Sequence, residues 1–313
     1  MTKKLGVLTV ALSLGLAVAA SAKLEVTKCV PADTFFIAKL NLAEALKSPV
    51  VTGLVSQHAE QYNVAKDFLT QNVGLSLEEI QTLWILSSKP NTATVVAQGK
   101  FDPVAIQHRF GTLPNVTEVH RDGCTYVARF EDQKKGTTNL GAILDGETIV
   151  FGEEACVSHF LDTFDGTGKA MPATDARLAK LLESKSAITA AVVGDLMSWP
   201  NVDKNIAATI SAAWFTCDLT TDLAAVLSLT ALTPDKANGL EFLLRGLIAI
   251  QTSDNQPTNK PVLQRLLKST TVTRDGTSIL LTARVTGADV QQLVPASQPP
   301  AAPPPPAAPA KAQ

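Results

Sequence analysis

The chain has 313 residues, of which 45% are hydrophobic and 18% are charged, and its 27 Lys and Arg residues stand against 29 Asp and Glu residues. Its longest basic runs are the pairs Lys3-Lys4 and Lys134-Lys135, so there is no stripe of cations to neutralise phosphates, which argues against a nucleic-acid partner. Between the two terminal segments, residues 23–294 are enough for one large or two small hydrophobic cores.

The first 22 residues have the pattern of a secretory signal peptide. Lys3 and Lys4 precede an apolar run at 5–20, and the run ends in Ala20-Ser21-Ala22, a small-x-small cleavage sequence. We therefore expect cleavage after Ala22 and a secreted or periplasmic mature chain without a transmembrane segment. Cleavage removes two lysines and no acids, so 25 cations face 29 anions and the mature side-chain charge is −4.

Residues 23–185 are predicted to form a first α+β half. A helix is expected after Asn41, with a break at Pro49, and another after Asp102-Pro103, because Asp is a good N-cap and Pro fits the first helical position. Dipeptides that favour hairpin turns occur at Asp122-Gly123 and Asp145-Gly146. Strands are expected at 34–40, around Trp84, and at 94–101, 124–130, 138–144 and 148–152.

Residues 186–294 are predicted to form a second α+β half with the same order of elements. A helix is expected at 205–210 and another after Thr233-Pro234, and Asp275-Gly276 favours a third hairpin. Strands are expected at 188–193, around Trp214, and at 223–232 and 279–285. The matching order favours two related halves, with coincidence as the alternative.

The expected fold class is therefore α+β: two related halves, with a mainly antiparallel sheet and helices packed on one face. Residues 94–101 alternate with the period of two that is typical of a strand with one packed face and one wetter face. The face that the helices leave uncovered is a candidate binding surface.

The expected helix at 235–251 is apolar around much of its circumference. Such a helix is either buried on most sides as a core helix or covers a groove for an apolar ligand or partner. The residues of this candidate apolar ligand surface are Leu240, Phe242, Leu243, Leu244, Leu247 and Ile248.

Four cysteines, Cys29, Cys124, Cys156 and Cys217, are an even number in an exported chain, which favours one or two disulfides. Free, buried thiols are the alternative. The predicted meander of strands places Cys124 and Cys156 at opposite ends, and this disfavours a bond between them, because a disulfide needs Cα atoms roughly 4.4 to 6.8 Å apart.

No catalytic, cofactor or metal motif is present, so we assign no catalytic, cofactor-binding or metal-binding residue and expect a protein that is not an enzyme. The nearest approach to a nucleophile and base is Cys156 with His159, which would share one face of a helix. A hydrolase that uses Cys156 is therefore the least favoured hypothesis.

The last 19 residues, 295–313, contain eight prolines interspersed with alanine. Proline favours extended polyproline-like chain and cannot join a core, so this segment is expected to be a disordered tail. As an alternative, the tail docks onto another envelope protein or the cell wall.

The opening segment Val30-Pro31-Ala32-Asp33-Thr34-Phe35-Phe36-Ile37, followed by Asn41-Leu42 and Ser48-Pro49, resembles exported bacterial proteins of unknown function that begin with P-A-D and a strand. The resemblance implies an α+β periplasmic domain without an assigned reaction. The favoured function is a binding or scaffolding role in the cell envelope, and the alternative is a periplasmic carrier of an apolar ligand or lipid.

Overall fold

The computed structural model describes residues 24–89, 92–113, 115–132, 136–193, 204–252 and 261–293. The predicted signal peptide and the proline-rich tail lie outside these residues. The strands are β1 (Phe36–Leu40), β2 (Ile80–Ser87), β3 (Thr94–Gly99), β4 (Val116–Glu118), β5 (Tyr126–Asp132), β6 (Thr137–Ile143), β7 (Thr148–Glu153), β8 (Ile188–Val193), β9 (Ile210–Leu219), β10 (Asp222–Ala231), β11 (Thr271–Asp275) and β12 (Ser278–Thr286).

Helices connect and flank the strands. They are α2 (Leu42–Lys47), α3 (Pro49–Gln57), α4 (Ala59–Phe68), α5 (Pro103–Gly111), α6 (Glu154–Phe164), α7 (Ala176–Glu183), α8 (Lys204–Ala207), α9 (Pro234–Thr252), α10 (Pro261–Ser269) and α11 (Gly287–Leu293), with short η1 (Val26–Lys28), η2 (Leu69–Val73) and η3 (Leu77–Glu79).

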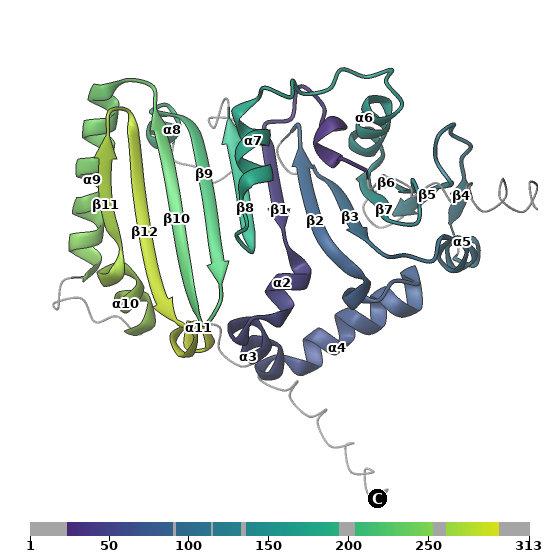
Figure 1. Ribbon diagram of the computed structural model, residues 1–313, viewed down its shortest axis with the longest axis horizontal. Coiled ribbons are helices and arrows are strands. Elements are labelled where there is room, and N and C mark those ends of the chain that lie inside the picture. Colours follow the sequence, from purple (N-terminus) through teal and green to yellow (C-terminus); the bar gives the residue numbers. More distant parts are fainter. Residues whose placement is uncertain are drawn as a thin grey trace, which may run out of the picture.

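The strands form a single 12-stranded antiparallel sheet in the order β11-β12-β10-β9-β8-β1-β2-β3-β7-β6-β5-β4 (Figure 1). Strands β1 and β8 join the two halves, with Ala38 opposite Ala190. The predicted α+β antiparallel fold is therefore confirmed, and the halves share one sheet.

Counted outward from the β1–β8 pair, the first two strands are arranged alike on the two sides. β2 and β3 form a hairpin beside β1, as β9 and β10 do beside β8. The next strand outward is β7 on one side and β12 on the other. By the order of elements in the sequence, the strand at 279–285 corresponds to the strand at 125–130, but the latter strand is β5, which lies two strands farther out than β7. The internal repeat itself stays a prediction.

Helices cover both faces of the first half of the sheet. We call the face with Trp84 and Trp214 the front face and the opposite face the back face. On the front, Val96 and Val150 pack with Phe160 of α6 and Leu181 of α7. On the back, their neighbours Ala97 and Ile149 pack with Ile106 of α5. The prediction that helices pack on one face is therefore wrong for this half. The prediction of a wetter face for β3 is also wrong, because a different layer of helices packs on each side of this strand.

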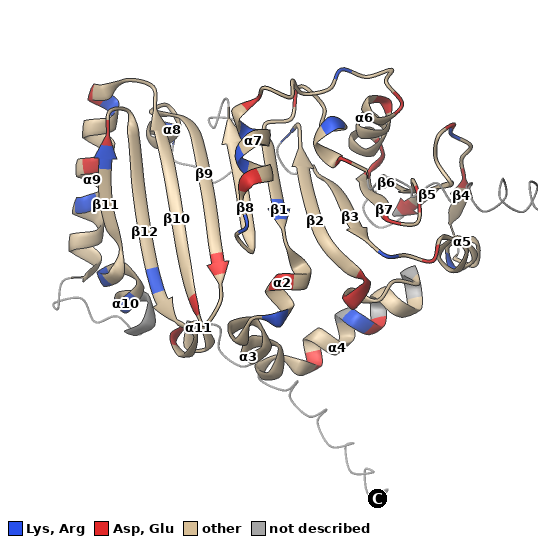
Figure 2. Cartoon of the chain, viewed as in Figure 1, with Lys and Arg blue, Asp and Glu red and all other residues tan. Residues whose placement is uncertain are grey.

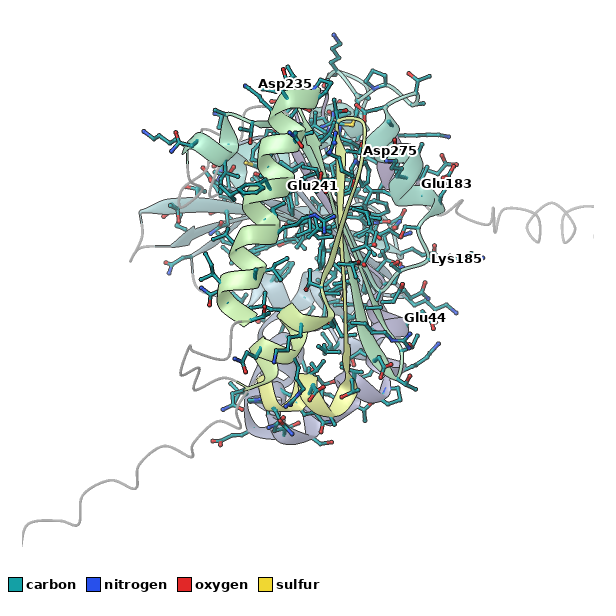
Figure 3. The ribbon with its side chains drawn as sticks, turned by 90° about the vertical axis from the view of Figure 1, so that its left-hand side faces the viewer. Glu44, Glu183, Lys185, Asp235, Glu241 and Asp275 are labelled. Carbon is teal, nitrogen blue, oxygen red and sulfur yellow. The ribbon has the colours of Figure 1, made fainter. Side chains whose placement is uncertain are left out.

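The second half keeps its described helices mainly on the back face. Leu240 of α9 packs with Leu229 and Ile279 of the sheet, and Leu266 of α10 packs near Val285. Figure 3, which shows the sheet edge-on, places α9 on one side and the Glu183 and Lys185 side chains on the other. On the front of the second half, Leu280 of β12 is 38% exposed and Trp214 of β9 is half-buried.

Local signals in the sequence set several element boundaries as expected. Asp102 accepts hydrogen bonds from the backbone N–H groups of Val104 and Ala105 at the start of α5. Thr233 accepts one from Lys236 at the start of α9, and Pro49 separates α2 from α3. All three predicted turns lie in hairpins, between β4 and β5, β6 and β7, and β11 and β12.

Candidate functional site

The predicted apolar surface on α9 divides into a buried side and an exposed side. Leu240 is buried, and Leu244 and Ile248 pack against the same core cluster. Phe242 is 81% exposed, Leu243 42% and Leu247 48%, and Ile250, one turn farther on, is 57% exposed. Positions four apart share a helix side, so 240, 244 and 248 face the sheet whereas 243, 247 and 250 do not. Core helix and exposed surface were alternatives in the sequence analysis, and both occur on this helix.

A cleft of about 450 Å³ lies between α8 and α9. Its lining residues are Asn205, Ile206, Thr209, Lys236, Gly239, Leu240, Leu243 and Leu247. Gly239 lies in the wall of the cleft, and a Cβ added there would meet no atom within 4 Å. A larger side chain at this position would therefore extend into open space. The volume falls within the range of about 300 to 1,000 Å³ that is typical of small-molecule sites.

The rim of this cleft is polar, whereas its wall is apolar. Lys236 Nζ donates a hydrogen bond of 2.8 Å to the carbonyl oxygen of Ala208, which holds the ammonium group beside α8. Leu243 and Leu247 supply the apolar wall. The sequence analysis missed the α8 residues, because nothing in the local pattern of 204–209 shows that they approach α9.

The four cysteines are free thiols in the structure, which contains none of the candidate disulfides and matches the alternative of free thiols. They lie on separate elements: Cys29 follows η1, Cys124 precedes β5, Cys156 is in α6 and Cys217 is in β9. The predicted meander is confirmed, with Val127 opposite Ala142 and Ala142 opposite Val150.

The Cys156 and His159 pair gains no support as a catalytic pair. Both residues lie on α6 as expected, but among the described residues no hydrogen bond joins Cys156 to His159, and His159 Nδ1 lies 3.5 Å from Asp33 Oδ1 instead. Burial raises the pKa of the Cys29 thiol to about 11, and it also raises the pKa values of Cys124 and Cys217. A raised pKa disfavours the thiolate, which is the nucleophilic form.

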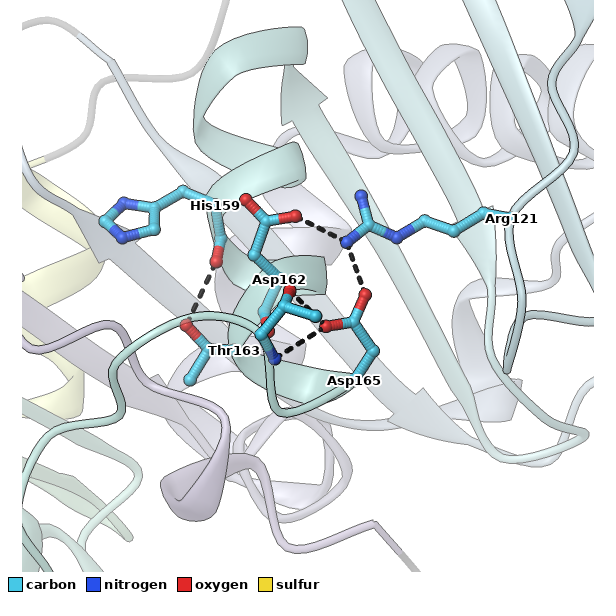
Figure 4. Close-up of polar contacts among 6 residues, drawn as sticks. Arg121, His159, Asp162, Thr163 and Asp165 are labelled. Atoms are coloured by element: carbon cyan, nitrogen blue, oxygen red, sulfur yellow. Dashed lines mark hydrogen bonds and ion pairs between the residues drawn. The ribbon is translucent and has the colours of Figure 1, made fainter.

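Charged side chains at the end of α6 form an ion cluster (Figure 4). Arg121 Nη2 lies 2.6 Å from Asp162 Oδ1 and 2.7 Å from Asp165 Oδ2. Hydrogen bonds from Thr167, and then from Arg121, lower the pKa of Asp165 to about 2. These contacts fasten the loop between β4 and β5 to α6, so the cluster has a structural role. Within the described residues, no three His, Cys, Asp or Glu side chains gather where they could hold a metal ion.

The fold and these surfaces define an α+β protein with a continuous antiparallel sheet and an apolar cleft on its back face. In the described part of the chain, we find no helix with the length and apolarity needed to span a membrane. No known protein family matches the sequence, and no curated protein does either.

The structure is similar to that of TP0453 from Treponema pallidum. Crystal form IV of that protein matches with a TM-score of 0.51 and 10% identity, over 88% of this chain and 98% of the other. Crystal form I matches with a TM-score of 0.49 and 10% identity, over 87% and 97%. At this identity the likeness concerns the fold alone. The resemblance to exported bacterial proteins that begin with P-A-D stays an expectation.

Proposed function

We propose that this chain is an exported, non-enzymatic binding protein of the cell envelope, and that the cleft between α8 and α9 binds an apolar ligand. The observation that carries the proposal is the group of exposed large apolar side chains, Phe242, Leu243, Leu247 and Ile250, on the helix that forms the cleft wall. Exposed large apolar side chains that gather on one element often mark a binding site, because exposing them to water is unfavourable, and Leu243 and Leu247 of this group line the cleft.

The lining favours an acyl chain with a small polar head. Leu240, Leu243 and Leu247 offer aliphatic contacts without a competing charge. Lys236 and Asn205 lie at the same cleft and can hydrogen-bond a carboxylate. A medium-chain fatty acid has both parts, so it is the ligand class that we propose.

The test is calorimetric titration of the mature chain with decanoate. We expect saturable binding that Gly239→Leu abolishes, because the added side chain would occupy the cleft. A double change of Leu243→Gln and Leu247→Gln should weaken binding by about tenfold or more. Leu182→Gln is the matched control, since Leu182 is 59% exposed on α7 and remote from the cleft. Undetectable binding, or binding that Gly239→Leu leaves unchanged, would reject the proposal.

A scaffolding role through residues 295–313 is the second candidate, and its support is the eight prolines of that segment. Extended proline-rich chain loses little entropy on binding and suits a docking segment. Capture of envelope proteins or cell-wall material by the full mature chain, compared with a chain ending at 294, tests this role. Equal recovery by both chains would exclude the tail as the docking segment.

A further inference from the structure

We propose that a groove on the front face of the second half binds a neutral carbohydrate. This groove, of about 330 Å³, lies beside α7 and over strands β8, β9 and β10. Its lining residues are Lys180, Glu183, Ser184, Thr189, Trp214, Thr216, Val226 and Ser228. It lies on the opposite face of the sheet from α9, so it is separate from the cleft of the proposed function.

Trp214 supplies an aromatic surface in this groove. In the sheet it stands between Ala191 and Ser228, two small residues that leave its large ring uncrowded along the sheet. Lys180 Nζ lies 4.9 Å from the ring centroid, which is a cation–π contact with the electron-rich face of the indole. The C–H groups of a sugar ring carry partial positive charge and are attracted to the same face. The flexible lysine stem lets the ammonium group move aside and donate to a sugar hydroxyl.

Hydroxyl groups line the groove around Trp214. Ser184 Oγ and Thr189 Oγ1 form a hydrogen bond of 2.6 Å to each other. Thr216 lies two residues along β9 from Trp214, and Ser228 is directly opposite Trp214 on β10. Each hydroxyl can donate one hydrogen bond and accept others, as sugar hydroxyls also do. An acyl chain would offer no hydrogen bond to the hydroxyl groups of Thr216 and Ser228, which is unfavourable.

The charges favour a neutral ligand over an anion. The groove contains one cation, Lys180, and one anion, Glu183, both on α7. Strands β9, β10 and β12 each carry a single charged residue, and Figure 2 shows these at the lower ends of the strands, away from their middle. Two of the three, Asp222 and Arg284, pair with each other at 2.8 Å. The surface thus presents an aromatic ring and hydroxyls without net charge, the combination that recognises a neutral sugar.

The experiment is a calorimetric titration of the mature chain with three neutral probes: cellotetraose, maltotetraose and tetra-N-acetylchitotetraose. We expect saturable binding of at least one. Trp214→Leu should weaken it by about tenfold or more, and Trp214→Phe by less, because an aromatic face remains. Trp214 also packs against the core cluster of the first half, so a second set of variants tests the hydroxyl groups. Thr216→Val keeps the size of the side chain and removes its hydroxyl group, and Ser228→Ala removes the hydroxyl group alone. Each should weaken binding by about threefold or more.

Thr230→Val is the matched control. Thr230 lies two residues from Ser228 on the same face of β10 and does not line the groove, so its replacement should leave binding unchanged. Gly239→Leu should also leave it unchanged, which separates this proposal from the fatty-acid cleft. The proposal is overturned if none of the three probes binds saturably, or if binding survives Trp214→Leu and both hydroxyl variants at full strength. A different result would also overturn the proposal in favour of an anionic ligand. In that case the unchanged protein would bind none of the sugars, and Trp214→Leu would abolish its binding of decanoate or inorganic phosphate.

Discussion

Asp165 shows how hydrogen bonds to a carboxylate change its protonation. Thr167, and then the guanidinium of Arg121, donate hydrogen bonds to this carboxylate, and its pKa falls to about 2. In the unfolded chain this carboxyl has a pKa of about 3.9. Ionised Asp165 therefore stabilises the folded state above about pH 4, and that contribution is lost as the pH falls through about 2.

The first prediction follows from this difference. Asp165→Asn should flatten the fall in the free energy of unfolding between about pH 4 and pH 2, as measured by urea titration at several pH values. Asp122→Asn is the control, because Asp122 lies near Arg121 in sequence but its side chain is fully exposed. A pH dependence in Asp165→Asn identical to that of the unchanged protein would contradict the role given to Asp165.

The cysteines give a second prediction at the residue scale. Burial raises the pKa of Cys29 to about 11 and lowers its access to reagents. Iodoacetamide at about pH 8 should therefore leave Cys29 unmodified in the folded mature chain. After denaturation without reductant, all four cysteines should react, as read by peptide mass mapping. Two reactive cysteines instead of four would show a disulfide and contradict the free thiols of the structure.

Individual elements differ in how they tolerate an added methyl group. Gly99 at the end of β3 has no room, since a Cβ would stand 2.0 Å from the carbonyl oxygen of Glu79. Gly246 in α9 meets nothing within 4 Å, and glycine in a helix interior costs roughly 0.5–1 kcal/mol relative to alanine.

We therefore predict opposite effects for two equal substitutions. Gly246→Ala should raise the free energy of unfolding by about 0.5–1 kcal/mol. Gly99→Ala should lower it by more than about 1 kcal/mol, because the backbone of η3 or β3 must move. Urea titration measures both. Equal effects of the two changes would show that the close approach of β3 to Glu79 is not maintained in solution.

Helix and hairpin boundaries were the most predictable part of the fold. The caps at Asp102 and Thr233 and the meander of β5, β6 and β7 depend on residues near each other in sequence. The faces that the helices cover were not predictable in this way. Successive residues of β3 do alternate between the two faces of the sheet. Both faces are buried, however, because α5 and α6 pack on opposite sides of the sheet.

At the scale of the whole molecule, the β1–β8 pairing makes one sheet of two halves. Five residue pairs, from Phe36 with Val192 to Leu40 with Ile188, connect them. Asn41 adds two hydrogen bonds across the boundary, from its backbone N–H to Ala187 and from its side chain to Ser186. Contact of this extent couples the stability of the halves.

We predict that the mature chain unfolds in a single cooperative transition. Far-ultraviolet circular dichroism and tryptophan fluorescence should give coincident urea curves, because separating the halves would leave one edge of β1 and one edge of β8 without hydrogen-bond partners. As a control, Leu182→Gln on the exposed side of α7 should leave the curves coincident. Two separated transitions would mean that the halves fold as independent domains.

The amino-acid sequence by itself determined the α+β class, the antiparallel hairpins and the starts of α5 and α9, because caps, turns and periodicity act over a few residues. It also marked α9 as unusually apolar. Only the tertiary structure decided which of its residues are core and which line a cleft with α8, and that Trp214 stands among hydroxyls beside α7. The physical reason is that these surfaces join segments far apart in the chain, and their pairing depends on packing that no local pattern contains.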